Sequence, residues 1–303
     1  MGMTSGSGKT WSDRIVTAHP NHVTVYGNDH SPWVQAVLLG LHDKGIAYTL
    51  VTRPPLSVFL DSGVTMPAAR IDDGEWILDS ERILTELGYS SVSPDDRDAL
   101  QSTFGRAALR RADSAWTFWH RFSFSRDGHP QTAPRLWNNF WRAFQVFYFF
   151  VLITMVRRRM PRADADAIAE AFAFFEDRLA ATPAFLGGDV PDTADLQLFG
   201  LIQMCASIPG PALAALRESP KLEGLRGWVG KMQARFSEYG RLYTAPVFEP
   251  KLTEIETASP LERAIYWAGA AIMWISLPIT VPIVFYYAAH VRKKALVPVR
   301  APQ

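Results

Sequence analysis

The chain has 303 residues, and its 31 lysines and arginines nearly balance its 30 aspartates and glutamates. This length allows one or two domains with a large core, and the near-neutral charge gives no sign of a nucleic-acid partner. The single cysteine, Cys205, excludes an intramolecular disulfide and a dithiol redox site. Because it lies in the apolar run from Leu198 to Ile208, we interpret it as a core residue rather than a nucleophile.

The N-terminal segment is rich in small and polar residues and lacks the apolar stretch of a secretory signal. The string from Gly6 to Thr10 resembles the end of a phosphate-binding loop. However, Met3 stands where that motif needs a glycine, and no strand precedes it. We therefore expect residues 1–21 to be a disordered N-terminus.

Residues 22–90 have the pattern of an α/β domain. The β-branched run from Val23 to Tyr26 predicts a strand, Ser31-Pro32 opens an amphipathic helix, and Tyr48 to Val51 predicts a second strand. A strand, a helix and a strand in this order form a parallel pair with a right-handed crossover.

The second part of this domain predicts a hairpin and a further helix. After a less regular stretch from Pro54 to Thr65, the segments Met66 to Ile71 and Glu75 to Leu78 are joined by an Asp-Asp-Gly turn, which favours a hairpin. Asp79-Ser80 then begins a helix that ends at Gly88.

Residues 97–250 are predicted to form an all-helical domain. A linker rich in serine, proline and aspartate, Ser90 to Asp96, precedes it. The clearest helical patterns run from Ala163 to Ala181, after Asp192, and from Leu222 to Phe236.

This layout, over about residues 22–245, resembles the glutathione transferase family. Four groups of residues carry the resemblance: Ser31-Pro32-Trp33, Met66-Pro67, Asp79-Ser80, and Phe185 to Asp189 followed by Asp192 to Asp195. The resemblance implies an α/β thioredoxin-like domain joined to an all-α C-terminal domain. It also implies glutathione as a co-substrate and no metal.

The resemblance gives each site residue a role. Ser31 would place a hydroxyl at a helix N-terminus, where the helix dipole favours an anion, and would stabilise the glutathione thiolate. Met66, followed by Pro67 in a cis peptide, would pair its backbone with the cysteinyl part of glutathione. Asp79 would meet the ammonium group of the γ-glutamyl end, and Ser80 would meet its carboxylate.

Each of these roles has an alternative. Ser31 and Ser80 are also suited to cap their helices, and Pro67 is compatible with a trans peptide at a strand start. Tyr26 competes with Ser31 as the thiol-activating residue, because other branches of the family use a tyrosine near the end of the first strand.

Further residues complete the expectations for the helical domain. We interpret Asp192 and Asp195 as helix-capping residues. By the same resemblance, an apolar co-substrate would bind between the domains, on an early helix whose aromatic residues otherwise belong to the core: Trp116, Phe118, Trp119 and Phe122. The histidines do not form a metal-binding set.

An apolar segment near the C-terminus predicts membrane attachment. Residues 264–290 contain no Asp, Glu, Lys or Arg, and a basic tail, residues 291–303, follows them. Since about 20 apolar residues span a bilayer, the segment predicts either a transmembrane helix or a re-entrant hairpin that turns between Pro278 and Pro282. A buried core helix is the other interpretation. The shorter run from Phe144 to Val156 fits a core helix or a helix lying on the bilayer.

Together these patterns predict a membrane-associated protein with its main domain in the cytoplasm, because no export signal is seen. The basic tail favours a cytoplasmic C-terminus, which a re-entrant hairpin reconciles with that placement and a spanning helix does not. The expected function is a glutathione transferase that conjugates glutathione to an apolar electrophile at a membrane surface, as in detoxification. The alternative is a non-catalytic, metaxin-like membrane adaptor or binding protein that retains the fold. The expected partners are glutathione, a hydrophobic small molecule and membrane lipid, without nucleic acid, and the resemblance allows a homodimer.

Overall fold

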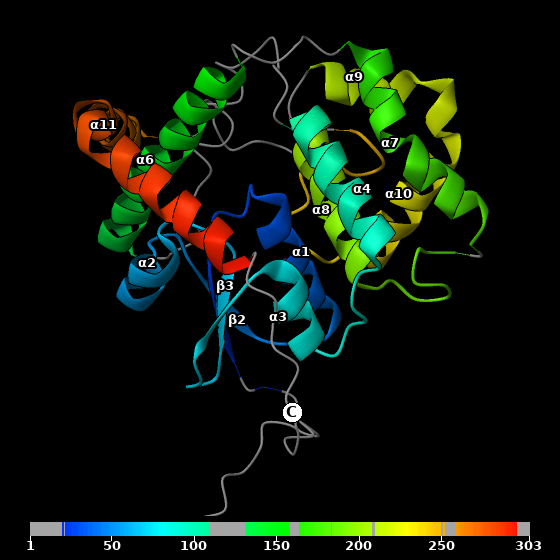
Figure 1. Ribbon diagram of the computed structural model, residues 1–303, viewed down its shortest axis with the longest axis horizontal. Coiled ribbons are helices and arrows are strands. Elements are labelled where there is room, and N and C mark those ends of the chain that lie inside the picture. Colours follow the sequence, from blue (N-terminus) through cyan, green and yellow to red (C-terminus); the bar gives the residue numbers. More distant parts are fainter. Residues whose placement is uncertain are drawn as a thin grey trace, which may run out of the picture.

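The computed structural model describes residues 20, 22–108, 131–157, 164–182, 184–207, 210–249, 251 and 259–295. Most of the predicted N-terminal segment 1–21 and most of the predicted tail 291–303 lie outside these ranges. The described chain forms a small α/β half and a larger helical half (Figure 1).

A four-stranded mixed sheet, in the order β2-β1-β3-β4, forms the centre of the α/β half. Strand β1 (Val23–Tyr26) pairs in parallel with β2 (Tyr48–Val51), which confirms the predicted parallel pair. On its other edge β1 pairs antiparallel with β3 (Ala68–Ile71), and β3 pairs antiparallel with β4 (Trp76–Leu78), which confirms the predicted hairpin.

Three helices complete this half: α1 (Pro32–Asp43), α2 (Leu56–Ser62) and α3 (Ser80–Glu86). The prediction of an irregular stretch from Pro54 to Thr65 is wrong, because α2 forms directly after Pro55. Its seven residues are too few for a helical period to be read from the sequence.

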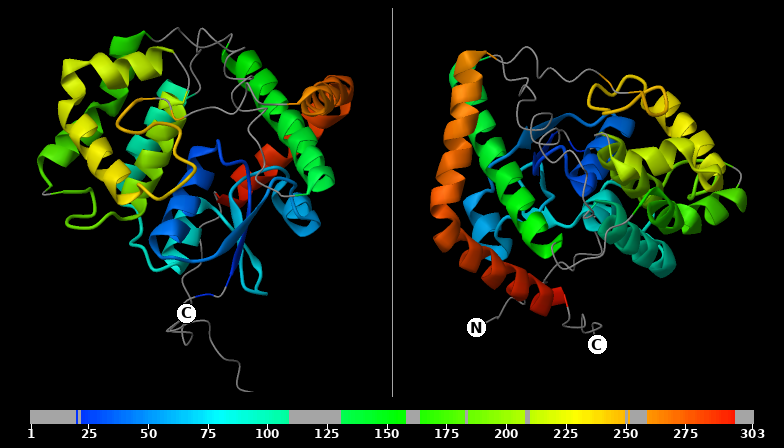
Figure 2. Two further views of the ribbon diagram at one scale, coloured as in Figure 1. Left: turned by 180° about the vertical axis from the view of Figure 1, so that it is seen from behind. Right: turned by 90° about the horizontal axis from the view of Figure 1, so that it is seen from above.

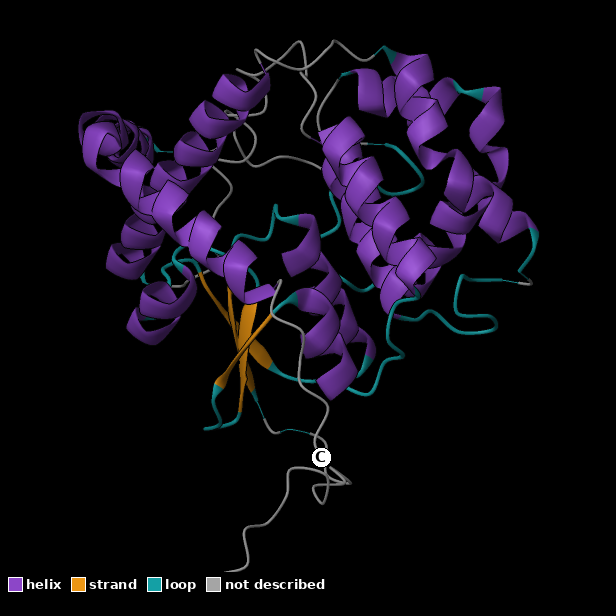
Figure 3. Cartoon of the chain, in the orientation of Figure 1, coloured by secondary structure: helices purple, strands orange, loops and turns teal. Residues whose placement is uncertain are grey.

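Helices cover both faces of the sheet (Figure 3), and side chains that alternate in direction along β1 contact the helices on each face. Val23 and Val25 join the core formed with α1 and α3. Tyr26 points to the opposite face, where it packs with Val58 of α2. Successive side chains of a strand point to opposite faces, so one short strand anchors both helical layers.

The helical half contains α4 (Pro94–Thr103), the π-helical turn η2 (Phe104–Ala108), α6 (Thr132–Arg157), α7 (Ala165–Ala180), α8 (Thr193–Ala206), α9 (Pro211–Glu218), the 3₁₀ turn η3 (Pro220–Leu222), α10 (Glu223–Arg235) and α11 (Pro260–Ala295). The three clearest predicted helices correspond to α7, α8 and α10. Helix α4 begins inside the predicted linker, because the Ser93 hydroxyl accepts the Asp96 N–H at 3.1 Å and caps the helix there.

One apolar core joins the two halves through α1 and α8. Leu38 of α1 belongs to the same buried cluster as Phe199 and Ile202 of α8. Gly200 allows the two backbones to approach closely, since a Cβ at this position would collide with the carbonyl oxygen of Pro32. The N-terminus of α1 is therefore held between the sheet and the helical half.

Helices α6 and α11 lie on the α2 side of the sheet, away from the other helices of this half (Figures 1 and 2). An ion pair of 3.2 Å joins Arg135 to Glu262, and further along both helices the rings of Phe147 and Trp274 lie 6.1 Å apart. Because these contacts follow the same order in both helices, α6 and α11 run parallel.

Helix α11 stays helical through Pro278 and Pro282. It bends along its length but does not reverse its direction (Figure 2). A proline lacks an N–H donor and a bend accommodates its ring, so the chain needs no hairpin here. The re-entrant hairpin turning at these prolines is therefore not the structure that the segment forms.

By length and composition, α11 is the one described helix that is long and apolar enough to cross a bilayer. Only 18% of its most apolar stretch is buried. A core helix of a soluble domain would be covered on most sides, so the buried-core interpretation does not fit α11.

Candidate functional site

Ser31 stands directly before α1, with Pro32 as the first helical residue. Its N–H donates to the carbonyl of Asn28 at 2.8 Å, and its carbonyl accepts from Gln35 at 2.9 Å. The half-buried side chain makes no capping hydrogen bond and has no hydrogen-bond partner among the described residues. The Ser31 hydroxyl therefore does not act as the helix cap that the sequence allowed.

Met66 lies beside the turn that carries Ser31. The N–H of Asn28 donates to the Sδ atom of Met66 at 3.3 Å, and Gly27 lies against the Met66 side chain. The Met66–Pro67 peptide is cis. Within the described chain the backbone N–H and C=O of Met66 form no hydrogen bond, so the backbone just before β3 is open to a ligand.

Asp79 is connected to the same loop. Its N–H donates to the carbonyl of Pro67 at 3.3 Å. Its Oδ1 atom accepts the N–H groups of Glu81 and Arg82, at 2.8 and 3.3 Å, and so caps α3. Both capping bonds end on Oδ1, which leaves Oδ2 of this exposed carboxylate for another partner.

Ser80 is the first residue of α3 and is buried. Its hydroxyl accepts a hydrogen bond of 3.0 Å from Nε2 of Gln197 on α8, so it ties the two halves together instead of capping α3. Sequence reasoning missed Gln197. The available signal was a polar side chain between Leu196 and Leu198, in a helix that is apolar over most of its length after Asp195.

These contacts bring the predicted site residues to one end of the sheet. Ser31 is linked through Asn28 to Met66, and Pro67 is linked to Asp79. Two helix N-termini belong to the group, and each presents the positive end of a helix dipole, although Asp79 already accepts the N–H groups of Glu81 and Arg82 in α3. The arrangement favours a ligand that carries negative charge and an extended backbone.

Tyr26 is not arranged to act on a ligand. Its side chain is fully buried, and its hydroxyl donates to the carbonyl of Val64 at 3.4 Å. Burial raises the pKa of Tyr26 above its ordinary value. Of the two hydroxyl groups considered for thiol activation, only that of Ser31 lacks a hydrogen-bond partner among the described residues.

Aromatic side chains from both halves flank the start of α1. The rings of Trp33 and Phe104 lie 5.6 Å apart, and those of His30 and Tyr243 lie 5.7 Å apart. The aromatic residues that we expected to line an apolar pocket, Trp116, Phe118, Trp119 and Phe122, lie outside the described residues. Trp33 and Phe104 provide an apolar surface next to Ser31.

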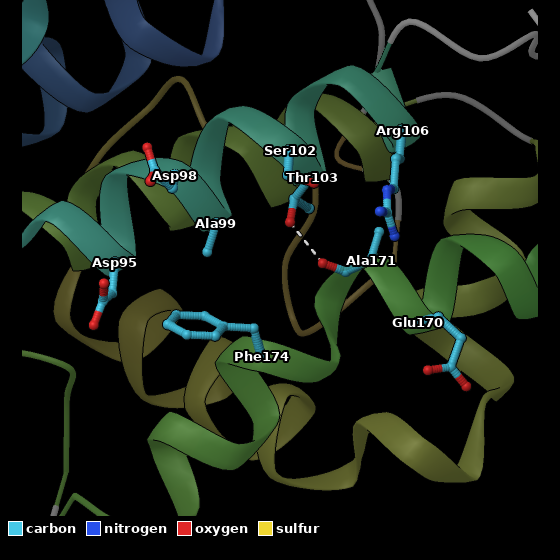
Figure 4. A pocket seen from close by; sticks show the side chains of 9 residues that line it. All are labelled: Asp95, Asp98, Ala99, Ser102, Thr103, Arg106, Glu170, Ala171 and Phe174. Atoms are coloured by element: carbon cyan, nitrogen blue, oxygen red, sulfur yellow. Dashed lines mark hydrogen bonds between the residues drawn. The ribbon is translucent and has the colours of Figure 1, made fainter.

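A depression of about 420 Å³ lies elsewhere, between α4 and α7 (Figure 4). Its wall combines acidic residues such as Asp95 and Glu170 with Arg106 and Phe174. It shares no lining residue with the candidate site. The mixed charges and the open shape give it no clear ligand class.

The described part of the chain holds no group of three or more His, Cys, Asp or Glu side chains arranged to bind a metal ion. Cys205 is buried, and burial raises the pKa of its thiol to about 12. Since the thiolate is the reactive form, Cys205 serves as a core residue.

Asp192 and Asp195 form a reciprocal capping box at the start of α8, as predicted. The Asp195 carboxylate also accepts the N–H groups of Leu186 and Gly187, both at 2.9 Å, and Nε1 of Trp228 at 2.9 Å. Burial raises the pKa of Asp195 to about 6, and the backbone donors oppose that rise. The two aspartates have a structural role and take no part in the candidate site.

A comparison with protein families finds a match in the helical half of the chain. Residues 155–231 match the family model described as glutathione S-transferase, C-terminal domain. A search of curated proteins finds no match.

Several solved structures are similar to the chain. The theta class glutathione S-transferase from Xanthomonas axonopodis pv. citri, with glutathione bound, has 16% identity and a TM-score of 0.42, over 75% of this chain and 99% of that chain. Poplar glutathione transferase F1 has 15% identity and a TM-score of 0.40, over 73% and 96%. Glutaredoxin 2 from Salmonella typhimurium, in complex with glutathione, has 15% identity and a TM-score of 0.43, over 72% and 95%.

With identities of 15–16% and TM-scores below 0.5, these likenesses assign no activity to the chain. The family match over residues 155–231 and the mixed sheet in the order β2-β1-β3-β4 describe the architecture. The fold is glutathione-transferase-like, with an α/β mixed sheet followed by a helical C-terminal domain.

Proposed function

We propose that this protein is a glutathione transferase that joins glutathione to an apolar electrophile at a membrane surface. The observation that carries the proposal is the uncommitted hydroxyl of Ser31 at the N-terminus of α1, in a turn that Asn28 connects to Met66. A hydroxyl donor and an unpaired stretch of backbone at the same end of the sheet suit a thiol attached to a peptide.

In this proposal, Ser31 activates the thiol of bound glutathione. The hydroxyl and the α1 dipole stabilise the thiolate, so the thiol proton is lost to solvent at a lower pH. The thiolate sulfur then forms a C–S bond with the electrophilic carbon of the second substrate. The electron pair of the broken bond leaves with the displaced group or, in an addition, moves onto the substrate and is protonated by water.

The remaining residues position the tripeptide. The backbone of Met66 pairs with the cysteinyl N–H and C=O, as an added strand would. The Oδ2 atom of Asp79 accepts the γ-glutamyl ammonium group. The N–H and the hydroxyl proton of Ser80, at the start of α3, meet the γ-glutamyl α-carboxylate, because the hydroxyl oxygen only accepts from Gln197 and keeps its own donor.

The apolar character of the second substrate rests on two features. Trp33 and Phe104 offer an aromatic surface beside Ser31. The long apolar helix α11 would hold the enzyme where apolar molecules concentrate, with its main domain on the cytoplasmic side of the membrane. Such substrates partition into lipid, and an attached enzyme would meet them there.

Calorimetric titration of the full-length protein with reduced glutathione tests the proposal. We expect saturable binding, and at least tenfold weaker binding of cysteinyl-glycine, which lacks the γ-glutamyl group that Asp79 and Ser80 would hold. Absence of binding at millimolar glutathione would refute the enzymatic proposal and favour the metaxin-like adaptor.

A further inference from the structure

One side of α11 is attached to the folded chain at both ends. Near its start, a stripe of residues with helical spacing is buried: Glu262, Tyr266, Ala270 and Met273. Gly269 allows close contact here, because its Cα lies against the backbone of Phe140 on α6. Near the other end, the ring of Tyr287 lies 5.6 Å from that of Phe59 on α2.

The opposite side of α11 is exposed and apolar over the same length. Its large side chains keep between 40% and 78% of their surface accessible: Trp267, Ile272, Trp274, Ile275, Ile279, Ile283, Phe285 and Tyr286. Residues 264–290 contain no Asp, Glu, Lys or Arg to interrupt this face. Soluble proteins rarely expose so continuous an apolar surface, so it needs a covering.

The contacts of α11 limit how it meets a bilayer. The stretch between Trp274, which touches α6, and Tyr287, which touches α2, is about 13 residues, or about 20 Å of helix. The hydrocarbon core is about 30 Å thick. Because α2 packs on the sheet of the α/β half, the contact of Tyr287 holds this end of α11 beside the folded domain, and the stretch that contacts neither α6 nor α2 is shorter than the hydrocarbon core.

Charge indicates which surface covers the exposed face. In the sequence, Arg292, Lys293 and Lys294 follow the uncharged stretch directly. A basic cluster beside an apolar helix matches the surface of a membrane that contains anionic phospholipid. Tryptophan and tyrosine side chains on the exposed face also favour the boundary between headgroups and hydrocarbon.

We infer that α11 lies in the plane of an anionic phospholipid surface, with its exposed face inserted and with α6 as its support, and that it does not cross the bilayer. This inference deepens the membrane part of the proposed function. Vesicle binding and glutathione binding are measured separately, so failure of one is distinguishable from failure of the other.

Insertion depth tests the geometry. Nitroxide labels are placed on single cysteines at Ile272, Ile275, Ile279 and Ile283 in a full-length Cys205→Ala background, on vesicles that contain phosphatidylserine. We expect all four labels within about 10 Å of the headgroup boundary. A spanning helix would instead separate the depths of the outer two labels by about 16 Å and bring one of them near the bilayer centre. That profile would overturn the inference.

Matched variants test the surface. Ile275→Glu and Ile279→Glu should each weaken vesicle binding by roughly tenfold to hundredfold, because a buried aliphatic side chain is replaced by a charge. Val190→Glu, at an equally exposed apolar position of the helical half, should leave binding unchanged. If the full-length protein does not bind vesicles and is an oligomer that only Ile275→Glu converts to a monomer, a second copy of the chain covers this face. That result would refute the lipid inference.

Discussion

The position of one hydroxyl distinguishes the two residues that were candidates for thiol activation. Ser31 lies at the start of α1, where its side chain makes no capping bond. Tyr26 is the last residue of β1, but its ring packs with Val58 of α2 and its hydroxyl donates a hydrogen bond to the carbonyl of Val64. Both residues fit the sequence pattern, and only the direction of the β1 side chains separates them.

Ser31→Ala should lower the rate of glutathione conjugation by about 10²–10³-fold and change glutathione affinity only several-fold. The hydroxyl acts on the charge that develops on sulfur, and one such donor has an effect of this size in ordered sites. Steady-state kinetics with an aryl halide measure both quantities. Tyr26→Phe is the control and should change the rate little, so the reverse pattern would show that the activating residue is misassigned.

Asp195→Ala should lower the free energy of unfolding by more than about 3 kcal/mol, because four N–H donors lose their acceptor in a buried place. Asp192→Ser keeps a capping oxygen and should change stability by less than about 1 kcal/mol. Urea unfolding followed by circular dichroism measures both variants. Equal effects of the two substitutions would contradict the separate roles given to them.

At the scale of elements, the contact between α1 and α8 positions the candidate site. Gly200 of α8 faces the carbonyl of Pro32, the residue after Ser31. Any displacement of α8 is therefore passed directly to the end of α1 that carries the hydroxyl. Close packing leaves little room to absorb an added methyl group.

Gly200→Ala should destabilise the protein by about 1–3 kcal/mol and lower the conjugation rate, because the added methyl group separates α1 from α8. Gly227→Ala in α10 is the matched control, since no atom lies within 4 Å of the added group. It should leave the rate unchanged and raise stability by about 0.5–1 kcal/mol. Thermal unfolding and kinetics on the same preparations test this, and a normal rate in Gly200→Ala would contradict the proposed link.

The elements with strong local signals were predictable from the sequence. The parallel pair, the Asp-Asp-Gly hairpin and the capping box at Asp192 and Asp195 each depend on residues close together in the chain. Helix α2 was not predictable, because seven residues are too few to show a helical period of hydrophobic residues. Nor were the Gln197–Ser80 bond and the parallel pairing of α6 with α11, which join segments more than 100 residues apart.

At the scale of the whole molecule, the main core does not depend on the apolar helix pair. The cluster that joins the sheet to α4, α7, α8 and α10 contains no residue of α6 or α11 among those described. Helices α6 and α11 contact each other, for example at Gly269 and Trp274 of α11. The α11 helix also contacts α2 of the α/β half. The molecule thus combines a self-sufficient two-part core with a helical attachment.

Ending the chain after residue 250 should release a folded protein from the membrane fraction, because the main core remains complete. Glutathione affinity should change only several-fold, while α6 loses the partner of Phe140 and Phe147 and becomes sensitive to protease. Sedimentation with membranes at neutral pH and limited proteolysis check the two parts, because a helix lying on the surface need not resist an alkaline wash. A truncated chain that stays with the membrane, or that unfolds, would contradict this division.

The most direct test of the central claim is the pKa of the glutathione thiol on the protein. Ultraviolet absorbance of the thiolate is followed against pH for free glutathione, for the complex with the full-length protein, and for the complex with the Ser31→Ala variant. An ordinary thiol has a pKa of about 8.5. We predict that the complex lowers the thiol pKa by about one unit or more, and that Ser31→Ala restores most of the difference. A bound thiol that titrates like the free tripeptide, or a lowered pKa that survives Ser31→Ala, would contradict the role given to this residue.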